Sequence, residues 1–234
     1  RFYENTFVIS DGGDSETIQI TRSVPDLDFI CENENRLWGC KNDTIYASKL
    51  GDIFNWNVYD GVSTDSFTVD VGSTGDFTAC ASYLGYPCFF KEEHVYKVYG
   101  DKPSNFQVMG SASLGVEKGS DRSLAIAGEV MFYLSRAGIA AWSGGIPQSI
   151  AAPFGMQRFK NAVAGSDGTK YYVSMQGKNG YELFVYDTRI KLWHREDDTE
   201  VIGWGWNEEL YFLDSSGKIQ ISGNARSVPA ASVR

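Results

Sequence analysis

Short runs of alternating apolar and polar residues fill almost the whole chain. Residues 44–47, 183–186 and 210–213 are typical, because each run combines β-branched or aromatic side chains and has Gly, Asp or Asn close to its ends. A period of two, bounded by turn residues, predicts β-strands. Only residues 156–164 have a pattern that could start a helix, and Gly155 and Gly165 would limit it to a turn or two. The sequence therefore predicts an all-β protein.

The strand pattern repeats with a period of about fifty residues. Ile45-Tyr46 recurs as Val95-Tyr96, and Trp56 recurs as Phe106. Each unit contains an inner strand, two further strands and an outer strand that we expect near Trp56 or Phe106. Four strands per unit, this period and aromatic residues in every unit are the signature of a β-propeller.

We predict a single β-propeller domain, residues 1–234, with about five four-stranded blades. The expected blades are residues 24–60, 74–110, 120–151, 159–197 and 199–222. The fifth shows no clear fourth strand, whereas residues 5–22 predict a hairpin around the turn Asp11-Gly12-Gly13-Asp14. Such a hairpin can complete the last sheet and close the ring, which removes an exposed edge.

Two other architectures stay open at this point. The string Arg-Ser-Val-Pro occupies residues 22–25 and again residues 226–229. Because its first copy leads into a blade, the second could do the same, and the chain would then be part of a six-bladed ring. The second alternative is a β-sandwich with accidental internal similarity.

The cysteines follow the repeat and predict no metal site. Cys31 and Cys40 return as Cys80 and Cys88, and none of these spacings is the C-x-x-C of a zinc knuckle. Disulfides are conceivable, but free cysteine is often buried and a chain of this length does not need staples. We expect reduced core thiols, no metal and no cofactor.

Composition and charge exclude several classes of function. Apolar residues make up 42% and aromatic residues 14%, which is typical of a folded protein. With 21 Lys and Arg against 30 Asp and Glu, the net charge is -9, which disfavours nucleic-acid binding. No apolar stretch approaches the ~20 residues of a membrane-spanning helix, and no signal peptide is recognisable. We therefore expect neither nucleic-acid nor membrane partners.

Carboxylates are the remaining candidates for chemistry. In a propeller the starts of the inner strands gather around one mouth of the central channel, where we expect Asp28, Asp76, Asp121 and Glu200. Glycosidases need two carboxylates about 5–10 Å apart. Acids also favour strand-entry turns for purely structural reasons, and a shared cation is an intermediate possibility. The sequence thus favours a protein that is not an enzyme and leaves glycoside cleavage open.

Six tryptophans could stack on sugar rings. Four of them recur at blade-like positions, where large aromatics fill the space between sheets: Trp38, Trp56, Trp142 and Trp193. Trp204 and Trp206 alternate with glycine and are better candidates for lining the channel or a face. These two residues are the candidates for stacking on a ligand.

Several strings resemble a known family. They are residues 35–40, 43–48, 51–56, 185–188, 192–196 and 209–212. Together they resemble the propeller proteins of bacteriophage and prophage structural modules, of which the tail-hub, or phage stabilisation, proteins of short-tailed phages are the best described.

The resemblance implies a rigid structural or adaptor protein of the tail or head-tail connector without catalytic residues. Its partners would be other virion proteins, with a homo-oligomer as a further possibility. Its location would be the virion, or the bacterial cytoplasm during assembly. The alternative function is a carbohydrate-binding or glycoside-cleaving propeller that uses acids at the channel mouth.

Overall fold

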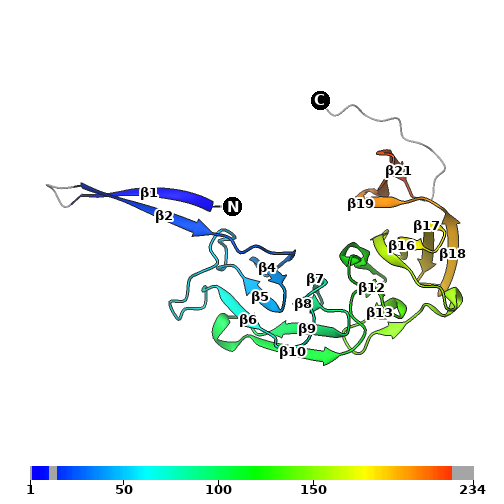
Figure 1. The fold of residues 1–234 in the computed structure, drawn as a ribbon, viewed down its shortest axis with the longest axis horizontal. Helices are drawn as coiled ribbons and strands as arrows, with labels where there is room; N and C mark the ends of the chain where they lie inside the picture. The colour runs from blue at the N-terminus through cyan, green and yellow to red at the C-terminus, as the bar shows by residue number, and fades with distance from the viewer. Residues whose placement is uncertain (1, 11–14, 223–234) are drawn as a thin grey trace. The chain divides into compact units, whose positions relative to one another are not determined.

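The computed structural model describes residues 2–10 and 15–222, with side chains from residue 24 onward (Figure 1). The predicted turn at residues 11–14 lies outside the described residues. Helix within the described ranges consists of three 3₁₀ turns: η1 (Pro103–Asn105), η2 (Asp121–Ser123) and η3 (Ala152–Phe154). None of the helices described there has the length and apolar character needed to cross a membrane. The all-β prediction is confirmed.

The chain divides into two compact units. One comprises residues 1–88 and 97–109, and the other residues 89–96 and 110–234. β1 (Phe2–Ser10) pairs antiparallel with β2 (Ser15–Ser23) as a two-stranded sheet. The next sheet has the order β3-β4-β5-β6, with bounds Phe29–Asn33, Arg36–Lys41, Thr44–Ala47 and Phe67–Asp70.

The remaining sheets follow the chain in order. The boundary between the units runs through the sheet β10-β9-β8-β7, whose strands are β7 (Ala79–Tyr83), β8 (Tyr86–Phe90), β9 (His94–Tyr99) and β10 (Gln107–Ala112). The next has the order β11-β12-β13-β14, with bounds Ala125–Ala127, Val130–Ser135, Gly138–Trp142 and Gln148–Ser149. The next is β15-β16-β17-β18, with bounds Lys160–Ser166, Lys170–Gly177, Gly180–Asp187 and Leu192–Asp197. The three-stranded sheet β19-β20-β21 comprises Val201–Asn207, Glu209–Asp214 and Ile219–Ile221.

The first hairpin of three successive sheets turns in the same way. The two residues between the strands are Glu34-Asn35, Leu84-Gly85 and Gly128-Glu129, and all six have positive φ. Two consecutive left-handed residues match the right-handed twist of the flanking strands, as in a type I′ turn. The backbone conformation of this first turn therefore repeats together with the strands.

The repeat in the sequence corresponds to a repeat in the structure. Tyr46 lies in β5 and Tyr96 in β9, each the third strand of its sheet in chain order. The cysteines behave likewise, because Cys31 and Cys80 lie in first strands and Cys40 and Cys88 in second strands. The predicted unit of about fifty residues is thus a four-stranded sheet.

Two local predictions are wrong. The outer strand of the first sheet is β6, Phe67–Asp70, whereas Trp56 lies in the long connection between β5 and β6, so the sheet extends past residue 60. The segment 156–164 is not helical, because η3 ends before Gly155 (φ 60) and β15 starts at Lys160. Instead, β15 pairs antiparallel with β16, and the buried Ala162 packs in an apolar cluster.

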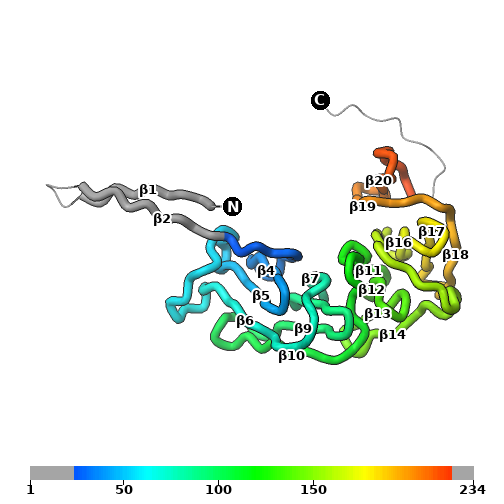
Figure 2. The backbone as a smooth tube through the Cα atoms, viewed as in Figure 1, coloured from blue at the N-terminus to red at the C-terminus, as the bar shows by residue number. Residues whose placement is uncertain are grey.

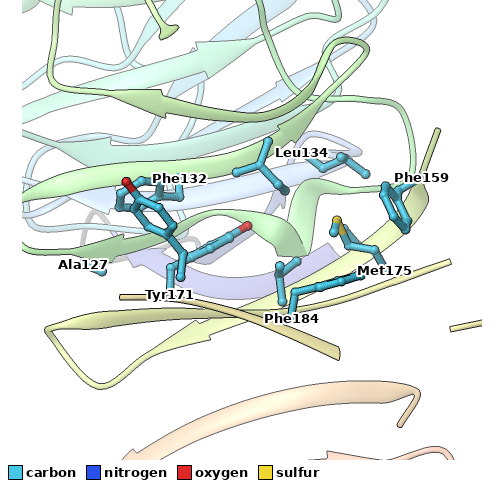
Figure 3. Close-up of a cluster of buried hydrophobic side chains, with 11 residues drawn as sticks. Ala127, Phe132, Leu134, Phe159, Tyr171, Met175 and Phe184 are labelled. Carbon is cyan, nitrogen blue, oxygen red and sulfur yellow. The ribbon is translucent and has the colours of Figure 1, made fainter. Parts of the chain in front are cut away.

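Much of the buried core of residues 110–222 is aromatic (Figure 3). The cluster joins side chains of two neighbouring sheets, including Phe132 and Leu134 of β12 with Tyr171 and Met175 of β16. The Phe132 and Tyr171 rings lie 5.2 Å apart between centroids. The Tyr171 hydroxyl donates a hydrogen bond of 2.9 Å to the carbonyl of Ser123, so its one polar group is satisfied inside the core.

Candidate binding surface

Two of the four candidate acids lie in the first unit. Asp28 immediately precedes β3, and its carboxylate accepts a hydrogen bond of 3.2 Å from the Lys41 ammonium, which also binds Asp26 at 2.6 Å. This pairing lowers the pKa of Asp26. Asp76 is exposed on the segment that leads into β7. Ion pairing at the surface accounts for Asp28 without any catalytic role.

The other two acids lie in the second unit. Asp121 is the first residue of η2, before β11, and Glu200 immediately precedes β19. The Tyr181 hydroxyl donates a hydrogen bond to the Glu200 carboxylate. The pKa of Tyr181 is raised, mainly by burial and further by the negative charge of Glu200. All four acids therefore lead into the first strand of a sheet, and their gathering at one channel mouth stays a prediction.

The two alternating tryptophans have different environments. The Trp204 indole donates a hydrogen bond of 3.3 Å to the Val163 carbonyl, and its ring lies 5.3 Å from Phe212 and 5.7 Å from Tyr172. A Cβ on Gly165 would lie 2.6 Å from this ring, so glycine is needed there. Trp206, in contrast, is 60% exposed. Trp204 is engaged in packing, which leaves Trp206 as the exposed member of the pair.

The four cysteines form no disulfide within the described residues, and two of them are in contact. All four lie in the first unit, where Cys40 and Cys88 are buried and Cys31 and Cys80 are partly buried. The Cys31 thiol forms a hydrogen bond with Cys80, and this contact together with burial raises the pKa of Cys31. Two residues along the same strands, the Asn33 amide donates a hydrogen bond of 2.8 Å to the Ser82 hydroxyl. Within the described ranges no group of three or more His, Cys, Asp or Glu could hold a metal ion.

A long connection joins β5 to β6 in the first unit (Figure 2). It comprises residues 48–66, and we name it the Arg36-anchored loop. Arg36 of β4 is buried, and its guanidinium donates hydrogen bonds to three loop carbonyls: Ser48 at 2.8 Å, Ser63 at 2.8 Å and Asp65 at 2.5 Å. Its Cζ also lies 5.7 Å from the centre of the Phe106 ring. One cation from the sheet thus holds both ends of the loop.

Further bonds order the loop internally. The Asp65 carboxylate accepts hydrogen bonds from the backbone N–H groups of Gly61, at 2.6 Å, and Val62, at 3.0 Å. The buried Trp56 indole donates to the Ile53 carbonyl at 2.8 Å. Backbone bonds from Lys49 and Ser66 also stay within residues 48–66. The conformation is therefore specified by buried polar contacts.

This ordered loop exposes apolar side chains. Five of these side chains are between 40% and 60% exposed: Leu50, Ile53, Phe54, Tyr59 and Val62. A pocket of about 500 Å³ in the same unit is lined by Val24, Pro25, Asp26, Leu27, Ile30, Leu37 and Trp56. Its lining is apolar apart from Asp26, and Trp56 belongs to the loop itself. Several exposed apolar side chains on one ordered loop, next to an apolar pocket, are a feature of interaction sites.

Sequence reasoning missed this loop because it treated Trp56 as part of an outer strand. Two signals were present: the turn residues Gly51-Asp52 and Asp60-Gly61 on either side of Trp56, and an arginine inside a predicted strand. An arginine on the buried face of a strand needs several acceptors, and a folded-back loop can supply them.

Comparisons with known proteins address the fold alone. No protein-family model and no curated protein matches the sequence. PorZ of Porphyromonas gingivalis, a bacterial surface component of the type-IX secretion system, aligns with 86% of this chain at 13% identity and a TM-score of 0.52. Hsv2 of Kluyveromyces lactis aligns with 92% at 12% identity and a TM-score of 0.53.

The chain covers 27% of the PorZ chain and 66% of the Hsv2 chain. The described residues form five sheets of three or four strands in chain order, besides the β1-β2 pair. This arrangement and the two structural neighbours are consistent with a β-propeller-like fold.

Proposed function

We propose that this chain is a non-catalytic binding module, in which the Arg36-anchored loop and the adjoining apolar pocket bind a protein partner. The observation that carries the proposal is the combination of a buried, multiply bonded anchor with five exposed apolar side chains on one loop. Of the eighteen large hydrophobic side chains that are exposed in the described residues, five lie on this one loop.

The physical advantage lies in the order of the loop before binding. Ordering a flexible side chain at an interface costs about 0.5–1.5 kcal/mol, and ordering a loop costs more. Here the buried contacts of Arg36, Trp56 and Asp65 meet part of that cost during folding. Phe54 and Tyr59 are 44% and 60% exposed, and burying the part of each side chain that is still exposed contributes roughly 1–1.5 kcal/mol, about half the value for full burial. They are the anchors that we expect to dominate binding.

The scaffold that we propose is a propeller of about five blades whose last sheet is completed by the N-terminal hairpin. The sheet β19-β20-β21 has three strands, and the β1-β2 hairpin supplies paired strands of nine residues each. Removal of residues 1–22 tests this closure, because it should speed hydrogen exchange at the amides of β21. Unchanged exchange there would favour an open arrangement or a further blade.

The kind of partner that we propose comes from the sequence resemblance alone. The strings that resemble tail-hub proteins favour another structural protein of a phage or prophage virion, and an adaptor role in the tail or head-tail connector. PorZ and Hsv2, which share only the fold, support the scaffold and say nothing about this partner.

Site-specific photo-crosslinking in the organism that encodes the chain tests the proposal. A benzophenone amino acid replaces Phe54 or Tyr59, and the same replacement at Ile146, which is 78% exposed in the other unit, is the matched control. We expect one dominant product from positions 54 and 59 that is absent at position 146, identified by mass spectrometry as a virion structural protein.

The outcomes separate the two parts of the proposal. A dominant cross-link to a protein from outside a virion would keep the binding loop and overturn the phage assignment. Equal cross-linking at all three positions, or none at positions 54 and 59, would overturn the loop as a binding surface.

A further inference from the structure

A second and larger pocket lies in the other unit. Its volume is about 920 Å³, and its walls come from four separate segments: Glu117, the turn after β12, the connection from η3 to β15, and the turn after β16. Pockets of about 300–1,000 Å³ are typical of small-molecule sites. This one has room for a ligand of several rings.

The charge of the lining is opposite to that of the chain. Four cationic side chains line the pocket, namely Arg136, Arg158, Lys160 and Lys178, against one carboxylate, Glu117. The whole chain, in contrast, has a net charge of -9. Arg136 forms an ion pair with Glu93, whereas the described residues show no ion pair for Arg158, Lys160 or Lys178. Such a lining concentrates anions from solution.

Glu117 has an unmet hydrogen-bonding capacity. One of its carboxylate oxygens, Oε2, is buried and has no hydrogen-bond partner, while its backbone N–H donates to the Leu134 carbonyl at 2.9 Å. Burial and the neighbouring Glu92 raise the pKa of Glu117, and Arg136 and Arg158 oppose that rise. A buried carboxylate oxygen without a donor is costly. A ligand hydroxyl can reach this oxygen only when the Glu117 side chain turns toward the pocket that it lines, and that contact would relieve the cost.

The rest of the lining is polar and modest in aromatic surface. Gln176 accepts a hydrogen bond of 2.7 Å from the Asn161 amide, which fixes its orientation, and the Gln157 amide donates to Glu182 at 3.3 Å. Phe159 is the aromatic member of the lining and is buried, whereas Met156 at the rim is 99% exposed. Polar groups and charges, more than ring stacking, would therefore determine which ligand binds.

We propose that this pocket binds an anionic saccharide, of which a short hexuronate oligosaccharide is the simplest example. Its carboxylates would pair with Arg158, Lys160 and Lys178, and a ring hydroxyl would donate to the carboxylate of Glu117. An anionic saccharide carries carboxylates and many hydroxyl donors on one small molecule. Its carboxylates match the cationic side chains of the lining, and its hydroxyl groups match the Glu117 carboxylate. The site is separate from the Arg36-anchored loop and does not depend on its role.

The proposal is for binding without cleavage. Glycoside hydrolysis needs a second carboxylate facing the first across the scissile bond. Glu117 is the single carboxylate among the residues that line this pocket. The bound saccharide would thus be recognised and left intact.

Isothermal titration calorimetry on the full chain tests the proposal. The probes are trigalacturonic acid, the neutral trisaccharide maltotriose and a hexaglutamate peptide. We expect trigalacturonic acid to bind, maltotriose to bind at least tenfold more weakly, and hexaglutamate not to bind. Arg158→Gln and Lys178→Gln should each weaken trigalacturonic acid by about tenfold, because each removes one charge-assisted contact.

Lys118→Gln is the matched control, because Lys118 is an exposed lysine next to Glu117 in sequence that does not line the pocket. Unchanged affinity in this variant supports a specific site, and an equal loss there would reveal general electrostatic attraction and overturn it. Absence of trigalacturonic acid binding overturns the proposal, and so does hexaglutamate binding that Arg158→Gln weakens, since the pocket would then hold an acidic peptide. Equal binding of maltotriose would overturn the role of the cations.

Discussion

Replacement of Arg36 by methionine tests the physical basis of the binding loop. Methionine keeps a side chain of similar length that can pack near Phe106, and it removes all three hydrogen bonds to the loop. The carbonyls of Ser48 and Asp65 then stay buried without a donor, whereas Ser63 is exposed and water can reach its carbonyl. The loss of stability therefore depends mainly on these two buried carbonyls, which have no donor in the variant.

The expected loss of stability follows from these two groups. A buried carbonyl that loses its partner costs about 1–3 kcal/mol. The variant also loses a buried cation whose pKa is lowered by desolvation, and removing that charge offsets part of the loss. We expect Arg36→Met to lower the free energy of unfolding of the first unit by about 2–4 kcal/mol. Arg36→Lys should lose less, because an ammonium replaces some of the bonds without the planar geometry of the guanidinium.

Urea unfolding followed by tryptophan fluorescence measures this loss, with limited proteolysis to locate it. Trp56 and Trp38 are buried reporters in the first unit. Arg122→Met, at an exposed arginine of η2, is the control and should change stability by less than about 0.5 kcal/mol. New cleavage within residues 48–66 should accompany the loss in Arg36→Met. Wild-type stability together with an unchanged cleavage pattern would refute the anchoring role of Arg36.

Three further predictions concern the scaffold. The Ser174 hydroxyl donates to the Thr199 carbonyl at 2.8 Å and accepts from the Val201 amide at 3.1 Å, so Ser174→Ala should cost about 2–3 kcal/mol in chemical unfolding, and a loss below 0.5 kcal/mol would contradict that role. Hydrogen bonds, first of all from Ser216, lower the pKa of Asp214 to about 2. The ionised carboxylate therefore stabilises the fold fully above the unfolded pKa near 3.8, and this stabilisation is lost as the pH falls towards 2. The thermal midpoint of Asp214→Asn should vary less over this pH range than that of the wild type. Oxidised glutathione should convert the Cys31 and Cys80 thiols into an internal disulfide, detected by mass spectrometry as the loss of two hydrogens, and the raised pKa of Cys31 should make this reaction slow at neutral pH. Cys80→Ser should abolish the mass loss and Cys88→Ser should preserve it. A disulfide that forms equally well without Cys80 would show that another pair of thiols reacts.

The sequence alone determined most of the strands and the repeat, although it misplaced the outer strand of the first sheet. Alternation and turn residues act between neighbours along the chain, so Tyr46 and Tyr96 could be matched before any contact was known. The same reasoning placed Asp28, Asp76, Asp121 and Glu200 on segments that lead into first strands. Whether these acids meet depends on the arrangement of sheets that are distant in sequence, which no local pattern contains.

Only the tertiary structure decided what the irregular segments do. In the sequence, Arg36 looks like an ordinary strand residue. In the structure, residues 48–66 fold back and bring three carbonyls to its guanidinium. Trp204 reads as a free aromatic until the neighbouring strand brings Val163 and Gly165 against it. The cationic pocket likewise draws its residues from four segments. The reason is physical: hydrogen bonds, burial and electrostatic fields depend on distance in space, whereas strand and turn propensities depend on distance along the chain.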